Sequence, residues 1–412
     1  MPLITQNFVL NNWTGDTQDY PTIEPSLRLD FANARALDPR ITFTRASTAT
    51  YVGRDGQIKT AGEDEARFDH DPTTGESLGL LIEESRTNIV THSQEFNNAY
   101  WSKNGGGNPG TTVTADQAVA PDGTTTADYI DYTTATTNSQ LIEKQFDNTP
   151  AGKTYTGSVW IKGTSGQTIN VILDGYGVDV TGEQYTLDGT WQRLTITRTY
   201  GPTFSAGALF RFGVRPLGLS AGTATQVYAW GAQIEEGSFP TSYIPTSGST
   251  ATRAADLPYI EGTSFSGWYN SEGGAYVLDV MAYSYSGSFF GFGTSSYLES
   301  FNVSNSGGTQ FYVPGNYNTS NAYTGNMNLD QSNKIGASFN STGQRVCSNG
   351  QSVNASGFTP PATSLFTDFD RLSFGGNIPW DKTYTSQRKT HVKSFSYYTK
   401  YLSDAQLQTL TQ

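Results

Sequence analysis

The chain has 412 residues and a formal net charge of −12. Such an acidic chain lacks the basic face that binding to nucleic-acid phosphates or anionic lipid head groups requires, which excludes both as principal partners. Charged residues are scarce at 15%, whereas aromatic residues reach 13%. This combination is typical of short strands around aromatic cores rather than of disorder.

Cysteine content and terminal composition bear on where the chain is made. Cys347 is the one cysteine, so no intrachain disulfide is available, and its place where a strand runs into a turn predicts a buried, unreactive thiol. The N-terminus lacks the basic and apolar regions of a secretory signal, and no apolar stretch reaches the ~18–20 residues of a membrane span. We therefore expect synthesis in the cytoplasm without membrane insertion.

Two segments precede the longer modules. Residues 1–25 are polar and contain three prolines, which predicts an extended arm that either anchors the chain to a partner or lies against the next module. Residues 26–92 are predicted to form a small β module. Alternation over 27–31 predicts a half-buried strand, Asp55-Gly56 predicts a tight hairpin turn, and the apolar run 78–82 has the length of a strand.

Residues 93–249 are predicted to form a jelly-roll sandwich, because nine short strand-like segments recur there between turns rich in Gly, Pro, Asn and Asp. On one of these strands, alternation places Trp160 on one face and Val159 with Ile161 on the other. Trp160, Trp191 and Trp230 all lie on strand-like segments. We therefore expect their side chains to lie in the core.

Residues 250–412 are predicted to form a second sandwich that ends in a helical turn. Ser403 is a suitable N-cap, and Gln406 stands three residues later as in a capping box. Leu407 and Leu410 then share one face of the helix. The predicted fold is all-β, with tandem β-sandwich (jelly-roll) modules after a small N-terminal β module and one short C-terminal helix.

Three parts of the sequence resemble modular proteins of tailed phages. Phrases within residues 40–92 resemble a phage head-spike-fibre module: Thr-Arg-Ala-Ser-Thr-Ala-Thr-Tyr at 44–51, Gly-Gln-Ile-Lys-Thr-Ala at 56–61, Arg-Phe-Asp-His-Asp-Pro at 67–72 and Leu-Leu-Ile-Glu-Glu-Ser-Arg-Thr-Asn at 80–88. Trp-Gly-Ala-Gln-Ile-Glu-Glu-Gly at 230–237, followed by Pro-Thr-Ser-Tyr-Ile-Pro-Thr at 240–246, resembles the closing strand of jelly-roll modules similar to carbohydrate-binding modules. Residues 397–410 resemble the end of a concanavalin-A-like or laminin-G-like sandwich.

The resemblance implies a phage virion structural protein that forms an external fibre, spike, or capsid or tail decoration and aids attachment to the host surface. It implies a homo-oligomer, with a trimer favoured, and other virion proteins as partners of the N-terminal region. Host surface glycan is a further candidate partner. The alternative is a receptor-binding or polysaccharide-degrading tail spike that acts on host glycans. A bacterial adhesin is a third hypothesis, which the missing export signal disfavours.

No catalytic set is evident in the sequence, so we expect that the chain is not an enzyme. The three histidines, His70, His92 and His391, show no metal-ligand spacing. The second sandwich also lacks acids at alternate positions of one strand, an arrangement that would aim the two carboxyl groups of a glycosidase into one cleft.

The sequence offers two candidate kinds of metal site and does not decide between them. Asp69-His70-Asp71 could bind a divalent ion, but in the resembling module this phrase forms a structural turn. Acidic loops such as 116–122 and 174–179 could hold a structural calcium. No other cofactor is expected.

Sugar binding would use exposed aromatic faces, because the C–H groups of a sugar ring pack against them while polar neighbours bind the hydroxyls. Candidates should lie in loops, where alternation does not place them in the core. Three residues meet this condition: Tyr176 lies between two glycines, Tyr317 between two asparagines, and Trp380 between a proline and an aspartate.

Overall fold

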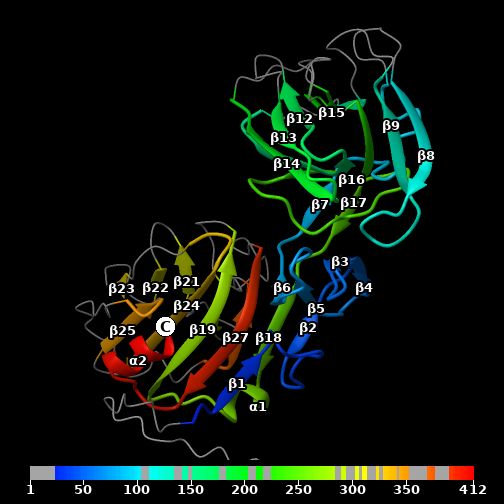
Figure 1. Ribbon diagram of the computed structural model, residues 1–412. Helices are drawn as coiled ribbons and strands as arrows, with labels where there is room; N and C mark the ends of the chain where they lie inside the picture. The colour runs from blue at the N-terminus through cyan, green and yellow to red at the C-terminus, as the bar shows by residue number, and fades with distance from the viewer. Residues whose placement is uncertain are drawn as a thin grey trace, which may run out of the picture.

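The computed structural model is an all-β chain arranged in two lobes that are joined by a pair of connecting segments (Figure 1). The structure describes residues 24–103, 111–133, 142–146, 151–175, 182–202, 210–216, 223, 225–283, 289–293, 302–305, 309–312, 322–323, 328–340, 343–351, 369–375 and 389–412. Among these residues, no helix is long and apolar enough to cross a membrane.

One lobe is a β-sandwich built from strands at both ends of the sequence, here called the split sandwich. Its larger sheet has the strand order β25-β24-β19-β27-β6-β5, with β1 beside β27. The strands are β1 (Leu27–Asp30), β5 (Arg67–His70), β6 (Ser77–Ile82), β19 (Gly273–Ala282), β24 (Ser332–Asn340), β25 (Gly343–Ser348) and β27 (Thr390–Tyr398). The smaller sheet has the order β2-β18-β26-β20. Its strands are β2 (Thr42–Thr44), β18 (Leu257–Glu261), β20 (Phe290–Gly293) and β26 (Arg371–Phe374).

The core of the split sandwich unites residues that are far apart in the sequence. Leu27 and Leu29 alternate with two exposed residues on β1, so their side chains point inward. They join Phe292, Phe395 and other aromatic residues in one buried cluster. The register pairs Leu27 with Tyr397, near the opposite end of the chain. Strands from residues 26–92 and strands after residue 250 therefore share both sheets.

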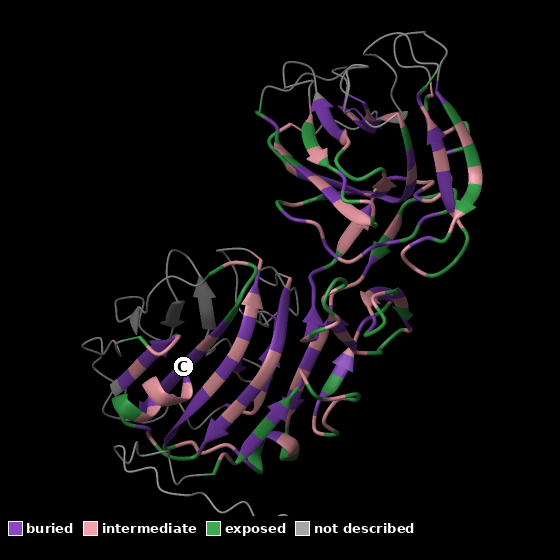
Figure 2. Ribbon diagram, in the orientation of Figure 1, coloured by how far each residue is buried: buried purple, intermediate pink, exposed green. Residues whose placement is uncertain are grey.

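The second lobe, here called the inserted sandwich, contains strands β8 to β16. One sheet has the order β14-β11-β16-β9-β8 and the other the order β10-β15-β12-β13. The strands are β8 (Thr112–Ala118), β9 (Ala127–Asp131), β10 (Ile142–Phe146), β11 (Thr154–Gly163), β12 (Thr168–Gly175), β13 (Glu183–Thr186), β14 (Gln192–Thr199), β15 (Phe210–Arg215) and β16 (Gln226–Glu236). Figure 2 shows buried and more exposed residues alternating along many of these strands, as expected for sheets with one covered face.

Short elements connect the lobes. Strands β7 (Arg86–Asn88) and β17 (Ala251–Arg253) lead into and out of the inserted sandwich and pair with each other. The hairpin of β3 (Ala49–Val52) and β4 (Ile58–Ala61) lies beside this connection (Figure 1). Gly56 in its turn has a φ of 75°, a conformation that suits glycine. The hairpin predicted at Asp55-Gly56 is therefore confirmed.

The remaining elements all follow β18 in the sequence. They are the helix α1 (Thr263–Ser266), the sheet of β21 (Asn302–Asn305), β22 (Thr309–Tyr312) and β23 (Ala322–Tyr323), and the helix α2 (Asp404–Leu410). The predicted capping box is confirmed, since the Ser403 backbone N–H donates to Gln406 Oε1 at 2.9 Å and the Ser403 side chain accepts from the Gln406 N–H. Cys347 is fully buried, and burial raises the pKa of its thiol. The all-β sandwich fold with a C-terminal helix is confirmed; the four-residue α1 was not foreseen.

Candidate functional site

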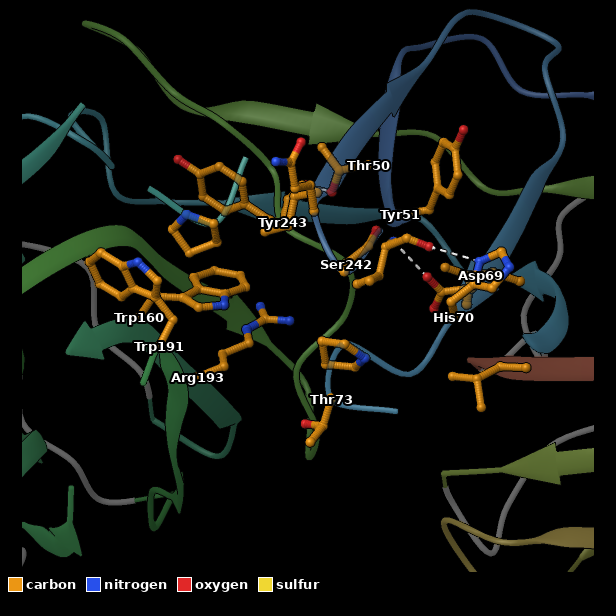
Figure 3. Close-up of a pocket in the computed structure, with 18 of the residues that line it drawn as sticks. Thr50, Tyr51, Asp69, His70, Thr73, Trp160, Trp191, Arg193, Ser242 and Tyr243 are labelled. Atoms are coloured by element: carbon orange, nitrogen blue, oxygen red, sulfur yellow. Dashed lines mark hydrogen bonds between the residues drawn. The ribbon is translucent and has the colours of Figure 1, made fainter. Parts of the chain in front are cut away.

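A cavity of about 700 Å³ lies at the junction of the two sandwiches. Its walls come from the β3–β4 hairpin with β5, from the inserted sandwich, and from the split sandwich at β27. Figure 3 shows Trp160, Trp191 and Arg193 on one side of the cavity and Asp69 with His70 on the other. Because three separate stretches of sequence contribute, the cavity exists only in the folded chain.

The aromatic wall depends on a bulge in β16. Trp160 pairs with Trp230, whereas Ser158 pairs with Gln233, so β16 contains one extra residue between these two pairs. Gly231 lies in this bulge with a φ of 67°, and a Cβ atom there would lie 2.8 Å from Trp160 Cε3. Glycine therefore allows the Trp160 and Trp230 rings to lie on one face, 5.4 Å apart between ring centres.

The loop after β16 contributes Tyr243 to the aromatic wall, and hydrogen bonds to buried side chains of β16 hold this loop in place. Glu235 is fully buried and accepts hydrogen bonds from the Thr241 N–H at 2.8 Å and the Thr241 hydroxyl at 2.7 Å. The Ile244 N–H donates to Gln233 Oε1 at 2.7 Å. These contacts fold the loop back over β16 and place Tyr243 4.6 Å from Trp230, ring centre to ring centre.

Arg193 covers the wall from β14. Its guanidinium carbon lies 4.4 Å from the centre of the Trp160 ring, within the range of a cation–π contact. One nitrogen, Nη1, donates to the Thr241 carbonyl at 2.7 Å, and Nη2 donates to Ser158 Oγ at 3.0 Å. Burial lowers the pKa of Arg193, although an arginine stays charged at any ordinary pH.

The expectation that all three strand tryptophans lie in the core holds for one of them. Trp230 has no exposed surface. Trp160 and Trp191 are half-buried and face the cavity instead. Alternation did separate Trp160 from Val159 and Ile161, which are fully buried in the core between the two sheets. It could not reveal that the outer face of β11 is one wall of a cavity.

A chain of hydrogen bonds forms the opposite wall. His391 Nε2 lies 2.8 Å from Asp69 Oδ2, and His391 Nδ1 lies 2.8 Å from the Tyr283 hydroxyl. The Val52 N–H donates to the other Asp69 oxygen at 2.6 Å. This chain joins the hairpin and β5 to β27, and its members line the cavity.

Protonation in this chain follows from its geometry. Burial acts to raise the pKa of Asp69, but the hydrogen bonds from His391 and from the Val52 amide outweigh it, so the pKa lies below its ordinary value. Burial lowers the pKa of His391 below 6.5. At neutral pH, Asp69 is therefore ionised and accepts from the Nε2–H of a neutral His391, while Tyr283 donates to Nδ1.

A buried group of charges lies behind the Ser242 side of the cavity. Arg67 is fully buried and donates through Nη1 to Glu83 Oε2, the Thr50 carbonyl and Ser242 Oγ, each at 2.8 Å. Glu83 also accepts from the Ser242 N–H at 2.7 Å. Burial raises the pKa of Glu83, but Arg253 and Arg67 outweigh it and hold the value well below the ordinary one.

Three arginines and two acids complete this group, which we call the buried ion cluster: Arg45, Arg67, Arg253, Glu83 and Asp256. Arg45 Nη1 lies 2.9 Å from Asp256 Oδ1, and Arg67 pairs with the other oxygen of Asp256. Arg253 Nη1 lies 3.4 Å from Glu83 Oε2. The cluster links β5 and the residues that directly follow β2 and β6 to the end of β17 and the segment after it, and through Ser242 to the loop of the inserted sandwich.

The Asp69-His70-Asp71 phrase ends β5 and begins a turn. Asp71 Oδ1 accepts from the N–H groups of Thr73 at 2.8 Å and Thr74 at 2.7 Å, an arrangement in which an aspartate starts a turn. Among the described residues, no group of three His, Cys, Asp or Glu side chains could hold a metal ion. Loop 174–179 lies largely outside the described residues.

The three loop aromatics proposed for sugar contact, Tyr176, Tyr317 and Trp380, lie outside the described residues, as do residues 1–23 of the predicted arm. The cavity residues Trp191, Arg193 and His391 were not singled out as site residues from the sequence. Nothing in their sequence context marks them; they meet the phage-like phrases only in the folded chain, where residues from 44–51, 67–72 and 240–246 contribute to the cavity wall.

No protein-family model and no curated protein matches the chain. Solved structures that match part of it include the CBM40 domain of Ruminococcus gnavus IT-sialidase bound to α2,3-sialyllactose, at 17% identity and a TM-score of 0.29, over 34% of this chain and 83% of that one. A CBM4 structure matches at 22% identity and a TM-score of 0.22, over 31% of this chain and 86% of that one. Trypanosoma rangeli sialidase with the inhibitor DANA matches at 15% identity and a TM-score of 0.29, over 38% of this chain and 26% of that one. Similarity this low supports no statement about the ligand or activity of this chain.

Proposed function

We propose that the chain is a structural protein of a phage virion that binds host-surface glycan, without cleaving it, in the cavity between its two sandwiches. The observation that carries this proposal is the cavity itself, which sets aromatic side chains opposite hydrogen-bonding groups. Its volume of about 700 Å³ lies within the range of ligand pockets. A short oligosaccharide needs both an apolar surface and a polar one, and the two walls supply them.

Trp191 is the side chain best suited to pack against a sugar ring. Its indole N–H donates to the Val119 carbonyl at 3.0 Å, which fixes the ring before a ligand arrives. The Trp160 ring, by contrast, is covered on one side by Arg193. An indole held in one orientation loses little conformational entropy on binding. Sugar C–H groups would pack on Trp191 while hydroxyl groups bond to the wall of Asp69 and His70.

The protonation of the lining acids favours binding over cleavage. Hydrolysis of a glycosidic bond needs one carboxyl group that keeps its proton near neutral pH. Asp69 has a lowered pKa and is already engaged by His391 and Val52. Asp55, also in the lining, has a pKa lowered by its hydrogen bond to Lys59. Both acids are therefore ionised at neutral pH and have no proton to donate to a leaving group.

Binding can be tested on the purified chain by calorimetric titration with oligosaccharides released from the host cell surface. Trp191→Ala should weaken binding by about two- to tenfold, since an aromatic contact contributes about 0.5–1.5 kcal/mol. Tyr228→Ala, which removes an aromatic of the outer face of β16 outside the cavity lining, is the matched control. Binding unaffected by Trp191→Ala would place the sugar elsewhere, and turnover of the oligosaccharide would favour the degrading tail spike.

The virion assignment rests on the phage-like phrases. Their residues hold the junction together: Asn88 Nδ2 donates to the Ile244 carbonyl at 2.9 Å, and its Oδ1 accepts from the Ile234 N–H at 3.1 Å. In this proposal the chain is a trimer in an external fibre, spike or decoration, with residues 1–25 attached to another virion protein. Immunogold labelling of intact particles with antibody to residues 261–412, with light scattering of the purified chain, tests it. A monomer that is absent from particles would refute it.

A further inference from the structure

Two cationic side chains from different sandwiches meet at the cavity wall. Arg193 comes from β14 of the inserted sandwich, and Lys389 directly precedes β27 of the split sandwich. Arg193 Nη1 donates to the Thr241 carbonyl at 2.7 Å, and Lys389 Nζ donates to the neighbouring Pro240 carbonyl at 3.4 Å. Both residues line the cavity. The loop between them therefore brings two positive charges to one part of the wall.

These cations differ from the other charges around the cavity. Asp69 pairs with His391 at 2.8 Å, and Asp55 pairs with Lys59 at 2.8 Å. Neither Arg193 nor Lys389 forms an ion pair with a carboxylate of the described residues; their nearest partners are carbonyl and hydroxyl oxygens. Arg193 Nε is in addition buried and has no hydrogen-bond partner among those residues. The wall thus contains one buried donor without a hydrogen-bond partner and two cations without a direct carboxylate partner among the described residues.

Burial makes this arrangement of two cations costly. Desolvation lowers the pKa of Lys389, and the positive charge of Arg193 acts in the same direction, against the attraction of Glu83, Asp69 and Glu235. Its ammonium lies 4.3 Å from the centre of the Tyr283 ring, so an aromatic face replaces part of its hydration. A buried cation without a carboxylate in direct contact is unfavourable, and an anionic group beside it relieves that cost.

We infer that the glycan bound in the cavity is acidic, with the anionic group of one sugar residue between Arg193 and Lys389 and its ring against Trp191. This inference rests on the proposed glycan-binding function. The planar guanidinium suits a two-oxygen acceptor such as a carboxylate, and the ammonium adds a point charge that a sulfate would also satisfy. The chemistry shared by both sources is an anionic substituent on a sugar.

The test is calorimetric titration of the full chain with three size-matched oligosaccharides: a uronic acid oligomer, the same oligomer after reduction of its carboxyl groups, and a sulfated counterpart. The uronic acid or the sulfated oligomer should bind at least about tenfold more tightly than the neutral one, and the preference should fall with added salt. Whichever acidic form binds identifies the group. Equal affinity for the acidic and neutral forms would overturn the inference but leave glycan binding intact, whereas no binding of any form would refute the proposed function itself.

Two lysine variants test where the anionic group of the glycan binds. Lys389→Gln should reduce the preference for the acidic oligomer by about tenfold, because the affinity for the acidic oligomer should fall much more than the affinity for the neutral one. Lys389 makes one weak hydrogen bond, so this variant should fold, which a thermal melt checks. Lys153→Gln removes the same charge from an exposed position paired with Glu236 and should change neither affinity. A full preference retained in Lys389→Gln would overturn the placement of the anion.

Discussion

Replacing Glu83 by glutamine should destabilise the chain strongly. Glu83 is fully buried, accepts two hydrogen bonds from Ser242, and pairs with Arg67 and Arg253. Glutamine has nearly the same shape, so the substitution Glu83→Gln removes the negative charge and leaves no large cavity. The buried ion cluster then contains three guanidinium groups and only Asp256 to balance them.

The expected magnitude follows from this imbalance. Removing one partner of a buried ion pair typically costs about 3–5 kcal/mol, because the other charge stays buried without compensation. The free energy of unfolding of a single domain is about 5–15 kcal/mol, so this loss is a large fraction of the total stability. Since Ser242 belongs to the loop of the inserted sandwich, the loss should also weaken the connection between the lobes and separate their unfolding into two transitions.

Urea unfolding followed by tryptophan fluorescence and circular dichroism measures both effects. Glu236→Gln serves as the control, because its side chain is 55% exposed and pairs with Lys153 at the surface, and such pairs contribute about 0–1 kcal/mol. If Glu83→Gln cost no more than Glu236→Gln and unfolding stayed in one transition, the cluster would not be the connection between the lobes.

Three further outcomes are expected. Gly231→Ala should cost about 1–3 kcal/mol and shift the fluorescence of Trp160, because alanine fits neither the positive φ nor the contact in the bulge; an unchanged melting curve would contradict this. Leu407→Ala, which empties the fully buried face of α2, should cost about 2–5 kcal/mol in urea unfolding, and a smaller loss would mean that the helix packs loosely. For His391, the folded pKa lies below the ordinary 6.5, so the unfolded chain binds the proton first and stability should fall as the pH drops below 6.5. His391→Gln should flatten the dependence of melting temperature on pH over that range; an identical slope would refute it.

Local features of the fold could be predicted from the sequence because their causes are local. Ser403 and Gln406 stand at the spacing of a capping box, and the helix begins there. Gly56 follows an aspartate between two alternating segments, and a hairpin results. The burial of Cys347 could also be predicted, although both faces of its strand are covered: Val346 lies in the core of the split sandwich, and Cys347 lies against Leu402 and Leu407.

The sites of long-range contact could not be predicted in the same way. No pattern within residues 26–92 indicates that Leu27 pairs with Tyr397, because alternation fixes which face is apolar and not which strand lies alongside. The same limit applies to Trp191 and Arg193, which become cavity residues only when another part of the chain covers their face of the sheet. Tyr176, Tyr317 and Trp380 stay predictions for sugar contact.

The pairing of β1 with β27 has a consequence for synthesis on the ribosome. Leu27 cannot pair until Tyr397 has been synthesised. At about 5–20 residues per second, the time between the synthesis of these two residues is roughly 20–70 s. The inserted sandwich, with its strands between Thr112 and Glu236, has all of its partners much earlier and can fold while translation continues. Its completion brings β7 and β17 together and thereby holds the unfinished strands of the other lobe near the place where β27 must arrive. A nascent chain stopped before residue 390 would carry one folded lobe beside open apolar strand edges, a state prone to aggregate.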